Sequence, residues 1–292
     1  MLGQSRDTED VQEVLDLEGF DWENMSCSYD AVFTTFWILY STGSQRIREH
    51  IKSDLDILGN AFDGIMNHTI SRADANKLIR DTYFQNTVDH DFTRGLFQSI
   101  PTVLDHLLSH CVMSLVSSGD VDCFQTKFMR HSMCPSISCI LKSDECLKRA
   151  LNFNGEVDTF EGVNIMFEQH FEPNKRHFKC DLCGVLMEVT NDVVSVPLIM
   201  CITFAGVIVG CEFERNIIIR DVPYELVSVI YAKGYHFKCR LNVGGSAYSY
   251  DGMIKGGKCQ SIGEEDPFPG TVYHRDGEII MNAQSIIYVR KD

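Results

Sequence analysis

The sequence is poor in basic residues, with 26 Lys and Arg against 41 Asp and Glu and a formal net charge of −15. Nucleic acids and anionic membranes bind proteins through a basic face, so this balance argues against both as partners. A negative surface suits a basic partner, although net charge also serves simply to keep a protein soluble. With 292 residues, 44% of them hydrophobic and 23% charged, the chain has the composition of a globular protein.

The N-terminal stretch, residues 1–13, is polar and acidic and lacks the apolar segment of a secretory signal peptide. We therefore expect an intracellular, reducing location, the cytoplasm or the nucleus, where disulfides are rare. The 12 cysteines then serve as core residues, metal ligands or a nucleophile.

Charged side chains are also absent from residues 193–210, so this segment has to be tested as a membrane span. Its β-branched residues, interrupted by Pro197 and Gly206, fit two buried strands joined at a bend better than one helix. We therefore predict buried strands at 193–199 and 201–209 and no membrane span.

Helical signals fill the first part of the chain, to about residue 118, and strand signals follow Glu188. Helices first and strands last predict an α+β fold and not a doubly wound sheet. Four helices are predicted: one follows Cys27, one runs from 46 to 58 and ends before Gly59, one runs from Ser71 toward Phe84, and one has Pro101 in its first turn and ends near 117–119. The other predicted strands are 216–220, 226–232, the two strands of a hairpin, 278–281 and 285–290.

The hairpin is predicted around the Gly-Gly pair at 244–245, which separates two runs of alternating apolar and polar residues, 234–243 and 246–253. Such a pair supplies the positive φ that a tight hairpin turn needs. His236 lies near the start of the first strand and Asp251 at the end of the second, so antiparallel pairing brings them together. The carboxylate can then bind one imidazole nitrogen and leave the other to take a proton.

Cys27 is the candidate nucleophile for this pair. At the start of a helix, the unpaired amides and the helix dipole lower the pKa of a thiol, and a neighbouring imidazolium lowers it further. A small buried cysteine, a strand histidine and an Asp-Gly turn each have ordinary structural explanations. Together, however, they occur in the chain order Cys, His, Asp, which is that of papain-like proteases and favours a catalytic triad. The apolar residues that predict the helix are Tyr29, Val32, Phe33, Phe36, Trp37 and Tyr40.

A zinc site is predicted from Cys180 and Cys183, whose two-residue gap and trailing glycine form a zinc knuckle. A pair of ordinary thiols or a redox motif is the alternative, but no βαβ pattern adjoins it. Four ligands need a second pair, and we expect a structural site that takes no part in hydrolysis. The predicted second pair is His131 and Cys134, with Cys139 and Cys123 as rivals.

Three segments carry a family resemblance: Asn24 to Ala31, which opens a helix, Tyr235-His236-Phe237, and Tyr248 to Met253. Together they resemble the Cys and His boxes of ubiquitin-specific proteases (USPs). They are especially similar to divergent USP-like cysteine proteases encoded by fungal transposable elements. The boxes cover a small part of the chain, but their order and separation span most of its length.

The resemblance implies a papain-like fold of the USP type, with a thumb, fingers and a palm in one catalytic domain. Its expected parts are an acidic lead-in at 1–19, a helical thumb at 20–118 with the nucleophile, zinc-binding fingers at 119–190, and a β-rich palm at 191–292 with the His and the Asp.

It also implies roles for single residues. Cys27 is the nucleophile, His236 the general acid and base, and Asp251 the group that orients the imidazole. Asn24 is a candidate oxyanion donor, and a helix cap is its alternative role. The family's usual Asn or Gln five or six residues before the Cys is missing here, because Asp21 and Trp22 occupy those positions.

The implied substrate is ubiquitin, whose basic Leu-Arg-Leu-Arg-Gly-Gly tail an acidic cleft would attract. Gly234 and Tyr235 would let the Gly-Gly end pass close to the backbone. The alternatives are the same chemistry on another ubiquitin-like modifier and a catalytically silent ubiquitin-binding module. We expect a monomer.

Overall fold

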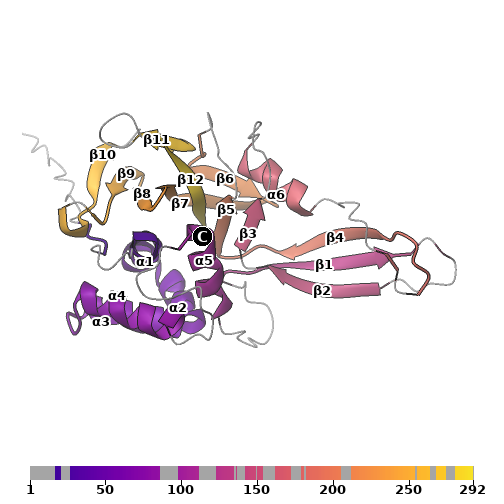
Figure 1. The fold of residues 1–292 in the computed structure, drawn as a ribbon, viewed down its shortest axis with the longest axis horizontal. Coiled ribbons are helices and arrows are strands. Elements are labelled where there is room, and N and C mark those ends of the chain that lie inside the picture. The colour runs from indigo at the N-terminus through magenta and orange to yellow at the C-terminus, as the bar shows by residue number, and fades with distance from the viewer. Residues whose placement is uncertain are drawn as a thin grey trace, which may run out of the picture.

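The computed structural model has an elongated shape, with helices and a large sheet at one end and a narrow three-stranded sheet extending from them (Figure 1). Helices come first in the chain and strands dominate the remainder, so the predicted α+β class is confirmed. The described residues are 17–20, 27–85, 98–111, 123–134, 136, 142–148, 150–153, 162–171, 179–180, 182–204, 212–253, 255–263, 268–273 and 280–291.

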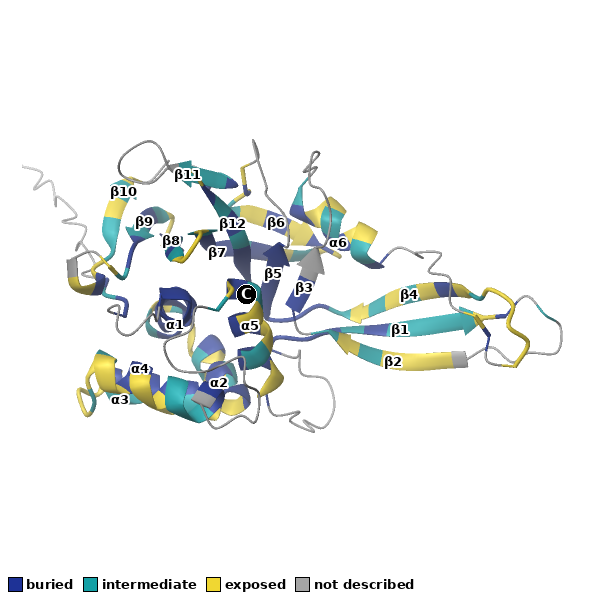
Figure 2. Cartoon of the chain, in the orientation of Figure 1, coloured by how far each residue is buried: buried dark blue, intermediate teal, exposed yellow. Residues whose placement is uncertain are grey.

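Helix α1 (Cys27–Thr42) is the centre of the helical part, and residues 27–40 are all buried. It is buried on every face, as expected for a helix enclosed by other elements, and Figure 2 shows it in dark blue. It packs against helices on one side and against β7 and β8 on the other. The other helices are α2 (Gln45–Asp54), α3 (Asp56–Met66), α4 (Arg72–Arg80), which continues as a π-helical turn to Gln85, α5 (Ile100–Ser109) and α6 (Val163–Phe171).

Serine side chains start several of these helices by accepting a hydrogen bond from a first-turn amide. Ser71 accepts from Asp74 N at the start of α4, and Ser99 accepts from Thr102 N at the start of α5. Pro101 lies in the first turn of α5. The predicted cap at Ser71 and the first-turn position of Pro101 are therefore confirmed, but α5 ends at Ser109 and not near 117–119.

The prediction of one helix from 46 to 58 was wrong, because α2 ends before Leu55 and Gly59 lies inside the next helix, α3. A Cβ atom on Gly59 would lie 2.6 Å from the Cα of Lys52. Gly59 therefore permits close packing of α2 and α3 and does not end a helix. Sequence alone does not separate these two uses of glycine.

Within the described residues the large sheet has nine strands, with β10-β9-β8-β7-β12-β5-β3 in order, β11 beside β12 and β6 beside β7. All pairs are antiparallel except β3 with β5. The strands are β3 (Ala150–Phe153), β5 (Ile199–Phe204), β6 (Asn216–Ile219), β7 (Val222–Lys233), β8 (His236–Val243), β9 (Ser246–Tyr250), β10 (Gln260–Gly263), β11 (Thr271–Tyr273) and β12 (Ile280–Arg290).

Strand β12 joins residues 280–281 of the first strand predicted near the C-terminus to the strand predicted at 285–290, and residues 278 and 279 lie outside the described residues. Its pairing with β7 shifts register between Ala283 and Ser285 and again between Ile287 and Tyr288. Such irregularities keep one strand continuous while interrupting its alternation, which explains why the pattern looked like two strands.

The three-stranded sheet contains β1 (Thr126–Met133), β2 (Lys142–Lys148) and β4 (Glu188–Ser195), in the order β2-β1-β4. The prediction of a buried strand at 193–199 was wrong in part: β4 alternates between exposed and covered residues, and Val194 is 56% exposed. Strand β5 is buried throughout, as predicted, and Pro197 lies between the two. Residues 205–209 of the predicted second strand lie outside the described residues. No helix in the described part of the chain is both long and apolar enough to cross a membrane.

Candidate active site and metal site

The predicted hairpin is confirmed as β8 and β9, joined at Gly244 and Gly245, whose φ angles are +58° and +86°. His236 is the first residue of β8, and Asp251 directly follows β9. The Nε2 atom of His236 lies 3.2 Å from the Oδ2 atom of Asp251. The structure therefore brings these two predicted site residues into contact.

Asp251 is buried, and three groups hold its carboxylate. Besides His236, the Met253 backbone N–H donates to Oδ1 over 3.1 Å, and Lys238 Nζ lies 3.4 Å from Oδ2. Burial alone raises the pKa of Asp251, but the His236 hydrogen bond, the His236 and Lys238 charges and the Met253 N–H together bring this pKa below its ordinary value. The carboxylate is therefore ionised at neutral pH.

Lys238 was missed by sequence reasoning. It lies two residues after His236 on β8, so both side chains project from the same face of the strand. A His-x-Lys pattern opposite an Asp was the available signal for a shared ion pair.

Asp251 fixes the use of the two imidazole nitrogens. Because the carboxylate binds Nε2, a neutral His236 carries its proton on Nε2, and Nδ1 is the atom that can accept one. Nδ1 is itself a buried atom. Nδ1 is therefore the ring nitrogen that does not face the carboxylate.

Cys27 is the first residue of α1, as predicted, and is buried. It belongs to the same core cluster as Phe237, the neighbour of His236. Thr35 of α1 donates a hydrogen bond to Ser228 of β7 over 3.0 Å, which joins the helix to the sheet beside β8. The N-terminus of α1 and strand β8 thus pack in the same hydrophobic core.

Residues 17–20, which precede Cys27 in the chain, contact both helix α1 and the large sheet. The Phe20 N–H donates to Thr34 Oγ1 of α1 over 3.1 Å, and the Tyr250 hydroxyl donates to the Phe20 carbonyl. A Cβ atom on Gly19 would lie 2.5 Å from both Thr34 Oγ1 and the Tyr250 ring. Only glycine fits at this position.

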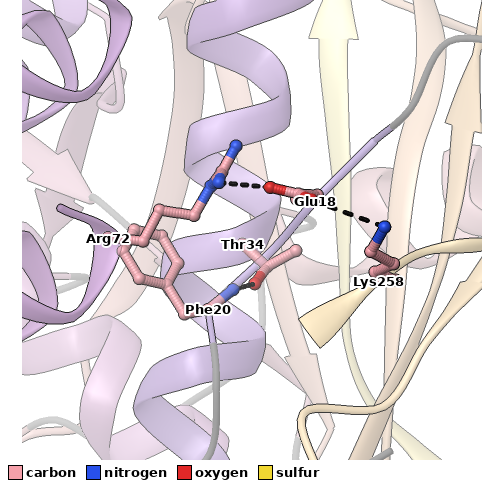
Figure 3. Close-up of polar contacts among 5 residues, drawn as sticks. All are labelled: Glu18, Phe20, Thr34, Arg72 and Lys258. Atoms are coloured by element: carbon pink, nitrogen blue, oxygen red, sulfur yellow. Dashed lines mark hydrogen bonds and ion pairs between the residues drawn. The ribbon is translucent and has the colours of Figure 1, made fainter. Parts of the chain in front are cut away.

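Ion pairs fix the same segment from two sides (Figure 3). Glu18 pairs with Arg72 of α4 and, at 3.8 Å, with Lys258. Glu18 and Lys258 also form an antiparallel β-bridge, and the Gly19 N–H donates to Gly257 O over 2.8 Å. These contacts therefore fix the position of Glu18 and Gly19 relative to α4 and the 257–258 segment.

Asn24, the predicted oxyanion donor, lies outside the described residues, as do Asp21 and Trp22. Gly234 and Tyr235 form the turn between β7 and β8, directly before His236. Gly234 has a φ of +59°, and Tyr235 is 69% exposed. These two residues are therefore placed at the surface beside the His–Asp pair.

Three of the predicted zinc ligands lie together: Cys134, Cys180 and Cys183 have sulfur atoms within 4.8 Å of one another. The Sγ atoms of Cys134 and Cys183 are 3.4 Å apart. The Gly184 N–H donates to Cys180 O over 2.7 Å, and Gly184 has a φ of +70°, which is the tight turn expected of a knuckle.

The structure does not bring His131 to these sulfurs. Its Nδ1 lies 2.9 Å from Ser143 Oγ, and its Nε2 lies 3.3 Å from Asp192 Oδ2. His131 belongs to strand β1, where residues three apart point to opposite faces and lie about 10 Å apart. The two-residue gap that joins ligands in a turn therefore separates His131 from Cys134. Cys139 lies outside the described residues, and Cys123 lies beside His50 and Asp54 instead.

Thiolates are preferred zinc ligands, so Cys134, Cys180 and Cys183 fit the donor set of a structural zinc ion. Bound there, zinc would crosslink the end of β1 to the turn that precedes β4. Both elements lie at the far end of the three-stranded sheet (Figure 1).

No protein-family model and no curated protein matches the sequence. Solved structures do match the fold. One is the SAGA DUB module Ubp8/Sgf11/Sus1/Sgf73 bound to monoubiquitin, with a TM-score of 0.60 and 11% identity over 94% of this chain and 69% of that chain. The same module bound to ubiquitin aldehyde gives 0.60 and 10%, over 94% and 70%. The comparisons thus support the predicted USP-like fold, and the likeness to transposable-element proteases stays a prediction.

Proposed function

We propose that the protein is a thiol-dependent deubiquitinase that hydrolyses the peptide or isopeptide bond after the C-terminal Gly-Gly of ubiquitin. The observation that carries the proposal is the His236–Asp251 pair on a hairpin whose core also contains Cys27. The matched modules, described as bound to ubiquitin, support ubiquitin as the substrate.

In the proposed reaction the Cys27 thiolate attacks the carbonyl carbon of the terminal glycine. The His236 imidazolium then gives its Nδ1 proton to the departing lysine amine, leaving a thioester. Neutral His236 next takes a proton from water, whose oxygen attacks the thioester, and returns that proton to the Cys27 sulfur. The products are ubiquitin with a free carboxylate and the intact enzyme.

Asp251 has two roles in this scheme. Its bond to Nε2 holds the ring in the tautomer that leaves Nδ1 as the acceptor, and its negative charge stabilises the imidazolium. Because several groups favour the ionised form of Asp251, it stays an acceptor throughout the cycle.

The oxyanion is proposed to face the Cys27 backbone N–H at the start of α1, with Asn24 as a second donor. Losing one oxyanion donor costs about 3 kcal/mol of barrier, or roughly a hundredfold in kcat. Asn24→Ala should therefore lower kcat by about that factor, measured on a ubiquitin substrate with a fluorogenic leaving group. A change of only a few-fold would assign Asn24 to helix capping.

In this proposal residues 20–118 are the thumb, 119–190 the fingers and 191–292 the palm, with ubiquitin's basic tail in an acidic cleft between thumb and palm. Gly234 and Tyr235 border the path of the Gly-Gly end. Zinc held by Cys134, Cys180 and Cys183 stabilises the fingers and takes no part in hydrolysis. The enzyme acts as a monomer inside the cell.

The test uses ubiquitin that carries a thiol-trapping electrophile at its C-terminus, with the reaction product weighed as an intact protein. The proposal predicts one adduct on the wild-type chain, none on Cys27→Ala, and a normal adduct on Cys146→Ser, a control cysteine on β2. Binding without an adduct would make the protein a silent ubiquitin-binding module. Labelling only by probes of another ubiquitin-like modifier would change the substrate.

A further inference from the structure

A second cluster of metal-ligand residues lies away from the active site and from the cysteine knuckle. His50, Asp54 and Cys123 each place one ligand atom within 4.8 Å of the other two. Asp54 is 6% exposed and Cys123 is fully buried, while His50 is half-buried. Imidazole, carboxylate and thiol are therefore gathered at the edge of the core.

Two elements hold these groups in place. His50 and Asp54 are four residues apart on α2, so their side chains lie on one face of the helix. Cys123 precedes β1 and is fixed to the large sheet, because its carbonyl accepts the Ile199 N–H over 2.7 Å. Phe124 beside it packs on Phe36 of α1, with ring centroids 5.8 Å apart. The three ligands thus come from preorganised backbone.

The carboxylate is also oriented by its neighbours. The Ser53 hydroxyl donates to Asp54 Oδ1 over 2.7 Å, and the Cys123 backbone N–H bonds the Asp54 carboxyl group. Ligating carboxylates in metal sites are typically held by such hydrogen bonds. Burying a carboxylate beside a thiol is costly unless a cation or further hydrogen bonds compensate.

We propose that His50, Asp54 and Cys123 bind one divalent transition-metal ion, with zinc as the expected metal. Nitrogen, oxygen and sulfur donors in one site suit zinc, whose tetrahedral shell a water or one further donor would complete. On binding, Cys123 loses its S–H proton to solvent and coordinates as a thiolate, and Asp54 coordinates as a carboxylate.

The position of the site suggests its effect. It joins α2, in the helical part, to the chain three residues before β1 begins at Thr126. Metal bound there would fix the base of the three-stranded sheet against the helices, whereas the cysteine knuckle crosslinks its far end. The inference does not depend on hydrolase activity, and its test reads metal binding directly.

The test starts from the full chain carrying Cys180→Ser and Cys183→Ser, which removes the knuckle. After dialysis against Zn²⁺ and then metal-free buffer, elemental analysis should find one zinc per chain. Adding His50→Gln or Cys123→Ser should remove it, and adding His68→Gln, a control on an exposed turn, should not. No zinc in the starting variant, or a count unchanged by His50→Gln, would overturn the proposal.

Cobalt provides a measurement that does not depend on the knuckle variants. Co²⁺ added to the metal-free wild-type chain should give absorption from two sites. His50→Gln should remove one equivalent and leave the thiolate-rich spectrum of the knuckle. Far-UV circular dichroism of each variant shows whether it is folded, and the half-buried His50 is the position that best tolerates exchange. A cobalt titration with the same stoichiometry for wild type and a folded His50→Gln would reject the site.

Discussion

The Tyr250 hydroxyl is one contact through which the sheet holds the segment before Cys27. It donates to the Phe20 carbonyl, and Tyr250 directly precedes Asp251. Tyr250→Phe removes this hydrogen bond and leaves a buried carbonyl unpaired, which costs about 1–3 kcal/mol. If residues 17–20 position the cysteine segment, part of this energy also enters the barrier of the proposed reaction.

We therefore expect Tyr250→Phe to lower the free energy of unfolding by about 1–3 kcal/mol and to lower kcat, by up to roughly 150-fold if all of this energy enters the barrier. KM should change little, because the residue is buried and cannot touch substrate. The assays are thermal unfolding and steady-state hydrolysis of a fluorogenic ubiquitin substrate, at a temperature where both proteins are fully folded.

Tyr288→Phe is the matched control. Tyr288 lies on β12, away from the His–Asp pair, and is equally buried. Its hydroxyl donates to the Glu214 carbonyl over 2.8 Å. It should lose a similar amount of stability, about 1–3 kcal/mol, and keep its turnover. Equal kcat values for the two variants would refute the idea that residues 17–20 position the nucleophile.

Other features give further expected outcomes. Lys238→Met removes a positive charge that lowers the pKa of Asp251, so this pKa should rise. The acidic limb of the kcat/KM profile, where Asp251 becomes protonated as pH falls, should therefore move to higher pH. An unmoved limb would contradict the shared ion pair. Cys180→Ser should abolish zinc binding by the knuckle and lower Tm, while Cys27 still reacts with the ubiquitin probe. Loss of labelling in a folded variant would instead give the metal a role at the active site. Gly59→Ala should destabilise the fold by about 1–3 kcal/mol by overpacking α2 against α3, and a raised Tm would show that the helices separate at little cost.

The His–Asp pair and the cysteine helix could be predicted because each depends on short-range rules. A Gly-Gly turn sets the hairpin register, and the register sets which ends meet, so His236 and Asp251 follow from local pattern alone. The spacing of apolar residues likewise predicted α1 from Cys27 onward.

Other features depend on packing between distant segments. Gly59 looked like a helix end because its partner, Lys52, belongs to another helix. His131 was predicted as a zinc ligand because two residues separate it from Cys134, as in a knuckle. In a turn, side chains at this spacing can face one ion, whereas in the extended strand β1 they point to opposite faces. Strand β2 is largely exposed and β1 is mostly half-buried, and the polar residues of both gave no clear strand pattern (Figure 2).

The pairing of β3 with β5 has a mechanical consequence for the three-stranded sheet. The chain joins this sheet to the rest of the molecule four times: into β1 at Cys123, from β2 into β3, from α6 into β4, and from β4 into β5. A sheet joined by one linker can swing about it, but one joined by four connections moves only if all of them change together. Domain exchange by excising residues 124–198 would also remove β3 and expose the edge of β5. The narrow sheet is therefore an outgrowth of the main body that cannot be separated from it as a module.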